Sequence, residues 1–136
     1  MINSRKIEDL LPEVAEKCEA FITACAKEDI DTIITSTFRD YESQDALYAQ
    51  GRTLPGPKVT QVRGGYSFHN FRVAFDFVPI VGGKAIWNDS ALWARCGKIG
   101  ESLGFEWGGS WAKFVDKPHM QLTGGKTLKQ FRIKTV

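Results

Sequence analysis

Cysteine is scarce in this sequence of 136 residues, and its placement excludes two common uses of the residue. The three cysteines are Cys18, Cys25 and Cys96, an odd number without a C-x-x-C pair, which argues against a disulfide framework and against a cysteine-rich zinc site. Because Cys18 and Cys25 lie seven positions apart in a helical pattern, we expect them to share a buried face. We interpret them as small core residues of a protein in a reducing compartment.

The sequence also lacks a surplus of one charge and a long apolar run. Its 18 basic and 16 acidic residues give a net charge of +2, which provides no reason to expect nucleic acid as a partner. No run approaches the roughly 20 apolar residues that a membrane-spanning helix needs, and residues 1–11 lack the apolar segment of a signal peptide. We expect synthesis in a cytoplasm without membrane insertion, so a target outside the membrane would require release by another factor.

What is present is the composition of a single globular domain. Hydrophobic residues make up 43% and charged residues 25% of the chain, as in ordinary globular proteins. A chain of this length can bury a core without crosslinks. Since we found no repeat or low-complexity segment, we expect residues 1–136 to form one domain, with a monomer as the default state.

Hydrophobic periodicity predicts helices and short strands along the chain. Apolar residues at three- and four-residue steps predict a helix from Arg5, capped by Ser4, unless Pro12 delays its start. The loop at 51–66 is long, and such loops often line binding sites. The other predicted elements are strands at 31–38, 73–80, 85–87, 105–107 and 116–122, helices at 41–50 and from Asn88 or Asp89 to 103, and a basic tail at 127–136 that is helical or frayed.

The two histidines and one misplaced carboxylate form the most informative pattern. Asp76 lies within the apolar segment 73–80, where an unpaired carboxylate is costly to bury. Together with His69 and His119 it makes a ligand set that can hold zinc and leave one position for water. Asp116, three positions before His119, is the candidate base for a proton of that water.

Each of these residues also has an interpretation that involves no chemistry. Sets of two histidines and a carboxylate arise by chance, and a lone histidine is common as a core or surface residue. Glu106 is a second candidate base, but it fits an exposed strand position equally well. Arg39 follows a predicted strand, where it can reach into a cleft or pair with acidic neighbours at the surface. Spacing alone leaves these alternatives open.

Several motifs in a fixed order resemble a known peptidase family. They are Ser36-x-x-Arg39-x-x-x-x-Gln44, Ser67-x-His69-Asn70-x-x-x-Ala74-x-Asp76-Phe77, Gly104-Phe105-x-Trp107-Gly108-Gly109-x-Trp111 and Asp116-x-x-His119. As an ordered set they resemble peptidoglycan peptidases related to D-alanyl-D-alanine carboxypeptidases, in the lysostaphin, D-Ala-D-Ala metallopeptidase and sonic hedgehog superfamily. The resemblance is to the L-alanyl-D-glutamate endopeptidase branch in particular, which includes phage endolysins.

The resemblance implies a fold and a set of catalytic residues. The fold would be α+β, with a central antiparallel sheet flanked by helices, like that of hedgehog and D,D-peptidase domains. Zinc would be held by His69, Asp76 and His119, and Asp116 would be the general base. Arg39 would steady a substrate carboxylate or the developing oxyanion, a role that suits a planar guanidinium.

The resemblance also implies residues that bind the substrate. Gly108 and Gly109 would let the backbone approach it. Arg72 stands where the family often has glycine, and a cation there could reshape the cleft rim or contact an acidic stem peptide. The implied substrate-binding residues are Ser36, Gln44, Arg72, Trp107 and Trp111.

The implied activity is zinc-dependent hydrolysis of the L-alanyl-D-glutamate bond in peptidoglycan stem peptides, as in a phage endolysin. One alternative is a carboxypeptidase, D,D- or L,D-, that removes a terminal D-alanine. Another, outside the enzymes, is a non-catalytic cell-wall-binding module that contains zinc. As an endolysin the protein would reach the wall through a holin, and it would act without a separate wall-binding module.

Overall fold

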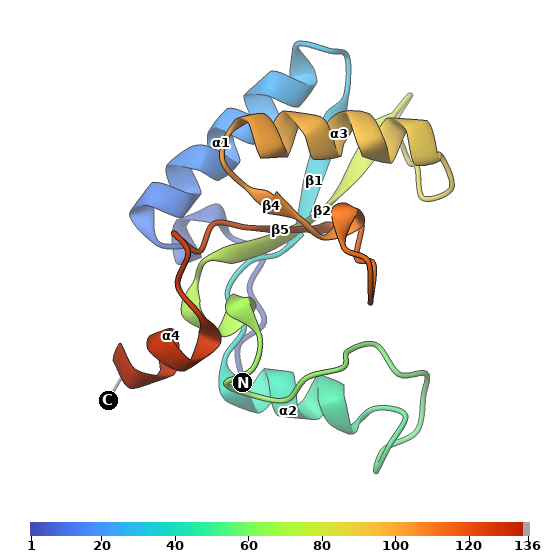
Figure 1. The fold of residues 1–136 in the computed structure, drawn as a ribbon. Helices are drawn as coiled ribbons and strands as arrows, with labels where there is room; N and C mark the ends of the chain where they lie inside the picture. Colours follow the sequence, from blue (N-terminus) through green and yellow to red (C-terminus); the bar gives the residue numbers. More distant parts are fainter. Residues whose placement is uncertain (135–136) are drawn as a thin grey trace.

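An antiparallel sheet forms the centre of the structure, a computed structural model that describes residues 1–134 (Figure 1). Its strands lie in the order β1 (Asp31–Ser36), β2 (Ala74–Val81), β5 (His119–Gln121) and β4 (Glu106–Trp107), and β3 (Lys84–Ala85) pairs with the end of β2. Every pair of neighbouring strands in this sheet is antiparallel. The predicted α+β class with a central antiparallel sheet is therefore confirmed.

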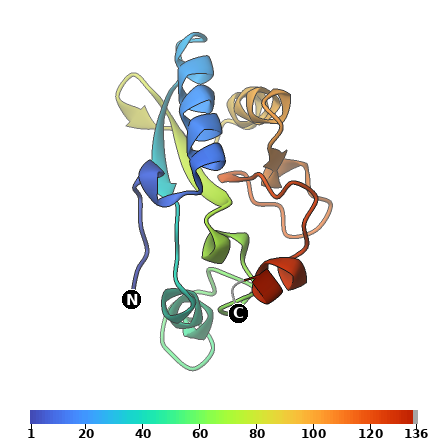
Figure 2. The ribbon, with the colours of Figure 1, turned by 90° about the vertical axis from the view of Figure 1, so that its left-hand side faces the viewer.

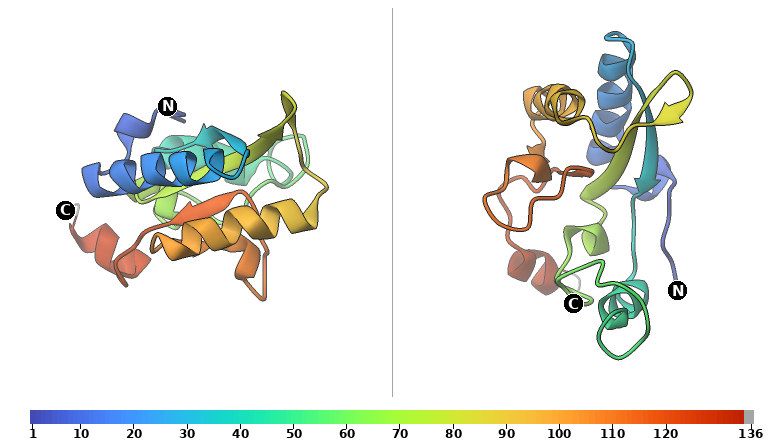
Figure 3. Two further views of the ribbon diagram at one scale, coloured as in Figure 1. Left: turned by 90° about the horizontal axis from the view of Figure 1, so that it is seen from above. Right: turned by 90° about the vertical axis from the view of Figure 1, so that its right-hand side faces the viewer.

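Helices flank this sheet unevenly. The helices α1 (Pro12–Ala26) and α3 (Ser90–Ser102) lie side by side and cover one face (Figure 3). The helix α2 (Tyr41–Ala49) and the loop that follows it lie at the far end of the molecule from α3 (Figures 1 and 3). The last helix, α4, spans Leu128–Lys134, and the end of the predicted basic tail, at 135–136, lies outside the described residues. Among residues 1–134, no helix is both long and apolar enough to cross a bilayer.

The first α-helix begins at Pro12, so the predicted start at Arg5 is wrong and the predicted alternative, a start delayed to Pro12, is confirmed. Proline suits the first helical position, because its missing N–H has no partner there and its φ already fits a helix. The preceding residues form a short 3₁₀ helix, η1 (Ile7–Asp9). The Ser4 hydroxyl accepts from the Lys6 N–H and donates to Asp9, so it stabilises this turn instead of capping α1. Figure 2 shows η1 just before α1, and it shows that α1 runs alongside β1.

The core lies between the sheet and the pair α1 and α3. Phe75 and Phe77 of β2 are fully buried and pack against Phe21 of α1, with ring centroids 5.7 and 4.9 Å from it. Successive residues of a strand point to opposite faces. Asp76, between these two phenylalanines, therefore points away from the helices to the other face of the sheet. The three cysteines are free and buried in this core, which confirms the predicted burial of Cys18 and Cys25.

Candidate metal centre

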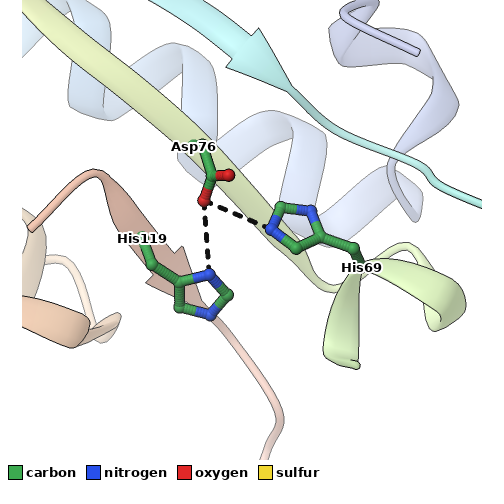
Figure 4. A group of neighbouring side chains, drawn as sticks. All are labelled: His69, Asp76 and His119. Carbon is green, nitrogen blue, oxygen red and sulfur yellow. Dashed lines mark hydrogen bonds and ion pairs between the residues drawn. The ribbon is translucent and has the colours of Figure 1, made fainter. Parts of the chain in front are cut away.

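Three side chains from separate elements meet on the sheet face opposite α1 and α3 (Figure 4). His69 comes from a 3₁₀ helix, η2 (Phe68–Phe71), whereas Asp76 and His119 are direct partners in the β2–β5 pairing. Asp76 Oδ1 lies 3.2 Å from His69 Nε2 and 3.3 Å from His119 Nδ1. Since one ligand atom from each residue lies within 4.8 Å of the others, the cluster is able to hold a metal ion. The structure thus brings together the three predicted ligands.

In each histidine ring, the nitrogen that points away from Asp76 has its own hydrogen-bond partner, and this partner determines which nitrogen carries the hydrogen. His69 Nδ1 lies 2.9 Å from the Thr37 carbonyl oxygen, and His119 Nε2 lies 2.7 Å from Gln121 Oε1. Carbonyl oxygens only accept, so both of these nitrogens carry hydrogens. The neutral rings then turn their lone pairs toward the Asp76 carboxylate, an arrangement that requires a cation between them. A proton or a metal ion meets this requirement. In metal sites, a ligating histidine typically donates its other ring N–H to a hydrogen-bond acceptor, as both rings do here.

The turn that carries His69 is held by two neighbouring residues of its motif. The Ser67 hydroxyl accepts from the His69 N–H, and Asn70 Oδ1 accepts from the Ser67 N–H, which makes a capping box. Asn70 Nδ2 also donates to the Arg39 carbonyl oxygen at 2.8 Å. Ser67 and Asn70 therefore fix the His69 turn against the segment of Arg39. Their part in the motif is structural support.

Charges at the cluster act strongly on one another. Burial disfavours a charged Asp76, but His69 and His119 outweigh it and hold the pKa of Asp76 well below its usual range. Burial also opposes a charged His119, yet contact with Asp76 raises the pKa of that imidazole. Burial, followed by repulsion from Asp76, raises the pKa of Asp116. Asp116 is exposed to solvent, which weakens the effect of burial and leaves repulsion from Asp76 as the stronger cause. A carboxylate with increased proton affinity suits a general base.

These groups open onto a cavity of about 640 Å³. Asp116 and Arg39 both line this cavity, so the predicted base and the predicted anion-binding residue lie beside the three candidate metal ligands. The loop at 51–66 forms one wall, so its predicted place at a site agrees with the structure. Besides the cluster, the lining includes Arg39, Lys58, Val59, Thr60, Gln61, Val62, Tyr66, Trp111, Phe114, Val115, Asp116 and Gln121.

Ser36 and Gln44, which were predicted as substrate-binding residues, lie outside the cavity lining and support Arg39 in its wall. Arg39 donates to Gln44 Oε1 at 2.8 Å and to Ser36 Oγ at 3.2 Å. Both partners are buried, and Gln44 is anchored in turn to the Val62 carbonyl oxygen. These bonds fix the plane of the guanidinium at the cavity wall.

The two predicted cleft tryptophans have different places. Trp111 lines the cavity, and its ring centroid lies 5.3 Å from that of His119. Trp107 lies outside the lining, because its ring packs between Gly97 of α3 and Gly109. Neither glycine has room for a Cβ against that ring. Trp107 Nε1 also donates to the Lys117 carbonyl oxygen, so this tryptophan supports the segment before β5 and does not border the cleft.

Gly108 makes room for the Asp116 segment, whereas the sequence predicted room for the substrate. A Cβ on Gly108 would collide with the Asp116 carbonyl oxygen. The Asp116 N–H donates to the Gly108 carbonyl oxygen at 3.0 Å, and the Asp116 carbonyl oxygen accepts from the His119 N–H at 3.1 Å. The glycine thus lets the candidate base and a metal ligand be held in one hydrogen-bonded turn.

Gly108→Ala is expected to lower the free energy of unfolding by roughly 1–3 kcal/mol, the usual cost of forcing extra volume into a packed site. The collision is with backbone, which cannot move aside like a flexible side chain. Chemical denaturation would measure the loss, with Ser110→Ala as the control, because Ser110 lies in the same turn and is exposed. A variant within about 0.5 kcal/mol of the wild type, the range of ordinary surface substitutions, would contradict this explanation.

Arg72 and Glu106 also lie outside the cavity lining. Arg72 donates to the Asp9 carbonyl oxygen at 2.8 Å, and its guanidinium lies 3.8 Å from the ring centroid of Phe38, so it anchors the N-terminal turn. This corrects its assignment to substrate binding. Its φ of 65° lies in the left-handed region that favours glycine, which explains why glycine suits this position. Glu106 is exposed on β4 and accepts from Gln121, which does line the cavity, and from Thr123.

Two supporting residues were not predicted from the sequence. Gln121 lies two positions after His119 on the same strand, so the two-residue period of a strand could have indicated that they share a face. The Thr37 carbonyl oxygen, which contacts His69, leaves no signal, because a backbone acceptor is present at every position.

Known proteins resemble this chain in sequence and in fold. A family model described as D-alanyl-D-alanine carboxypeptidase matches residues 60–122. The peptidoglycan L-alanyl-D-glutamate endopeptidase CwlK of Bacillus subtilis (strain 168) is 42% identical over 123 residues, which cover 84% of this chain and 74% of that protein. The L-alanyl-D-glutamate peptidase of Listeria phage A118 is 35% identical over 96 residues, or 68% of this chain and 30% of the phage protein. The crystal structure of the Serratia marcescens L-Ala D-Glu endopeptidase ChiX has a similar fold, with a TM-score of 0.66 at 20% identity over 92% of this chain and 86% of the other.

Proposed function

This chain belongs to the family of peptidoglycan peptidases that includes D-alanyl-D-alanine carboxypeptidases and L-alanyl-D-glutamate endopeptidases, and we propose that it hydrolyses the L-alanyl-D-glutamate bond of stem peptides. The observation that carries the proposal is the identity of 42% to an endopeptidase of that specificity, over 84% of the chain. The cluster of His69, Asp76 and His119 beside a lined cavity supports it.

Zinc is the metal that we propose for this site. His69 Nε2, Asp76 Oδ1 and His119 Nδ1 would hold it, and two imidazoles with one carboxylate are a known ligand set of catalytic zinc. When bound, the ion supplies a water of lowered pKa and polarises the carbonyl of the scissile bond. Both rings already have the far nitrogen hydrogen-bonded, so little reorganisation is needed for binding.

Asp116 and Arg39 would provide the remaining chemistry. Asp116 would take a proton from the attacking water and deliver it to the amine that leaves. The raised pKa of Asp116 favours the first transfer, and its solvent exposure gives water a path to it. Arg39, held by Ser36 and Gln44, would bind a carboxylate of the stem peptide or the negative charge that develops on the scissile carbonyl oxygen.

We extend the proposal to the setting in which the enzyme acts. Residues 1–136 would form one catalytic domain and act as a monomer on the cell wall. The phage relative supports an endolysin, which would depend on a holin for release, whereas the Bacillus relative supports a bacterial enzyme equally well.

Mass spectrometry of digested muropeptides tests the proposed bond. Hydrolysis between L-alanine and D-glutamate should leave L-alanine on the glycan side and free peptides whose new amino terminus is D-glutamate. Release of terminal D-alanine with the L-alanyl-D-glutamate bond intact would instead establish the carboxypeptidase alternative. Binding to the wall without either product would establish the non-catalytic wall-binding module.

A further inference from the structure

A line of hydrogen bonds leads from His119 to a carboxylate outside the cavity. His119 Nε2 lies 2.7 Å from Gln121 Oε1, and Gln121 Nε2 donates to Glu106 Oε2 at 3.1 Å. The Thr123 hydroxyl donates to the other carboxylate oxygen of Glu106 at 3.0 Å. His119, Gln121 and Thr123 are all buried, with 7%, 5% and 7% of their surfaces exposed. Only Glu106, at the end of the line, is exposed.

The sheet dictates this alignment. His119 and Gln121 are two positions apart on β5, so they point to the same face. Glu106 of β4 is the direct antiparallel partner of Gln121, and partners in a ladder share a face as well. The side chains of His119, Gln121 and Glu106 therefore lie in one row on the sheet face that carries the candidate metal ligands.

The line also determines where the hydrogens lie. A carboxylate can only accept, so the amide of Gln121 must turn its nitrogen toward Glu106 and its oxygen toward His119. That oxygen can only accept, so His119 must carry its hydrogen on Nε2. The lone pair is then left on Nδ1, the nitrogen that lies 3.3 Å from Asp76.

We propose that Glu106 is a positioning residue that acts through Gln121 to hold His119 in the tautomer that can bind the metal. A side chain at position 106 that can also donate, such as glutamine, leaves the amide of Gln121 free to turn around and offer its N–H to His119. His119 would then carry its hydrogen on Nδ1 and could not bind through that atom. This inference rests on the metal site proposed above, and it gives an exposed residue outside the cavity an influence on metal affinity.

Glu106→Gln is expected to weaken zinc binding by about tenfold, at the lower end of the 10–100-fold range for partners of metal ligands, because Glu106 is exposed. Competition with a chelating dye measures the Kd for zinc directly, with no substrate present. The matched control is Glu101→Gln, since Glu101 is also exposed and accepts a hydrogen bond from Ser110, at 3.1 Å, outside the line. Its Kd for zinc should equal that of the wild type.

Ring-nitrogen NMR of metal-free protein with a neutral His119 gives a second readout. A larger fraction of His119 should carry its hydrogen on Nδ1 in Glu106→Gln than in the wild type. A Kd for zinc within about twofold of the wild type would overturn the inference alone, and so would an unchanged tautomer population. A wild-type chain that binds no zinc would overturn the proposed metal site and this inference with it.

Discussion

Asp116→Asn should reduce hydrolysis of stem peptides by about 10²–10⁴-fold, the usual contribution of a general base. Asparagine has nearly the same shape but cannot take a proton from the attacking water. Asp116 is outside the cluster of metal-holding atoms, and its backbone bonds to Gly108 and His119 do not involve the side chain. Zinc content should therefore stay at that of the wild type while turnover is lost.

Zinc content and the rate of product release must be measured on the same preparation of the variant. Asp31→Asn is the matched control, because it makes the same exchange of acid for amide at an exposed position at the start of β1. The control should keep both zinc and turnover. Wild-type turnover by Asp116→Asn would refute the assignment of the base, whereas loss of zinc together with turnover would show that Asp116 holds the metal.

The sequence predicted the ligand cluster because strand alternation exposes an anomaly. Asp76 stands in the apolar segment 73–80, and a carboxylate in a buried strand needs a partner or a metal ion. The fold class was implied by the resemblance of the ordered motifs to the peptidase family. The anomaly depends on local periodicity and the resemblance on the order of the motifs, and a sequence shows both directly.

The supporting residues were assigned less well, because their environments depend on packing between distant segments. Trp107 was expected at the cleft, but its ring fills space left by Gly97 on α3, and no local pattern links the two. Arg72 was expected at the rim, but a left-handed backbone directs it to Asp9. The link from Glu106 to His119 depends on the register of β4 and β5, which periodicity does not supply.

The residues of the motifs therefore meet at one candidate site, and several that were predicted to contact the substrate support that site instead. Ser67 and Asn70 hold the turn of His69, and Gly108 accommodates the backbone of Asp116. A site that must hold three ligands and a base in fixed positions needs many such supports. A match to a motif is thus stronger support for the site as a whole than for the role of any one residue in it.

Asp76→Asn is expected to remove metal binding and, with it, the contribution of the metal to folding stability. The variant replaces the carboxylate that contacts both His69 Nε2 and His119 Nδ1 with a neutral amide. Free zinc at 100 times its Kd stabilises a folded protein by about 2.7 kcal/mol. A chelator should lower the unfolding midpoint of the wild type and leave that of the variant unchanged.

Asp89→Asn is a suitable control for this exchange. Asp89 caps α3 by accepting from the Leu92 N–H at 3.0 Å, and asparagine caps helices about as well as aspartate. This control should keep its zinc and its sensitivity to chelator. A chelator-sensitive Asp76→Asn variant with full zinc content would show that Asp76 is not a ligand.

The pH dependence of unfolding separates the loss of the metal from the loss of an ion pair. In the metal-free wild type, Asp76 raises the pKa of His119, so this pair contributes stability that is fully present below the ordinary histidine pKa of about 6.5. That contribution is lost as the pH rises through the raised pKa of His119. The stability from zinc has the opposite trend, because protons compete with the metal for the histidines as the pH falls. Asp76→Asn should therefore be less stable than the wild type at alkaline pH only when zinc is present, and at mildly acidic pH also in its absence.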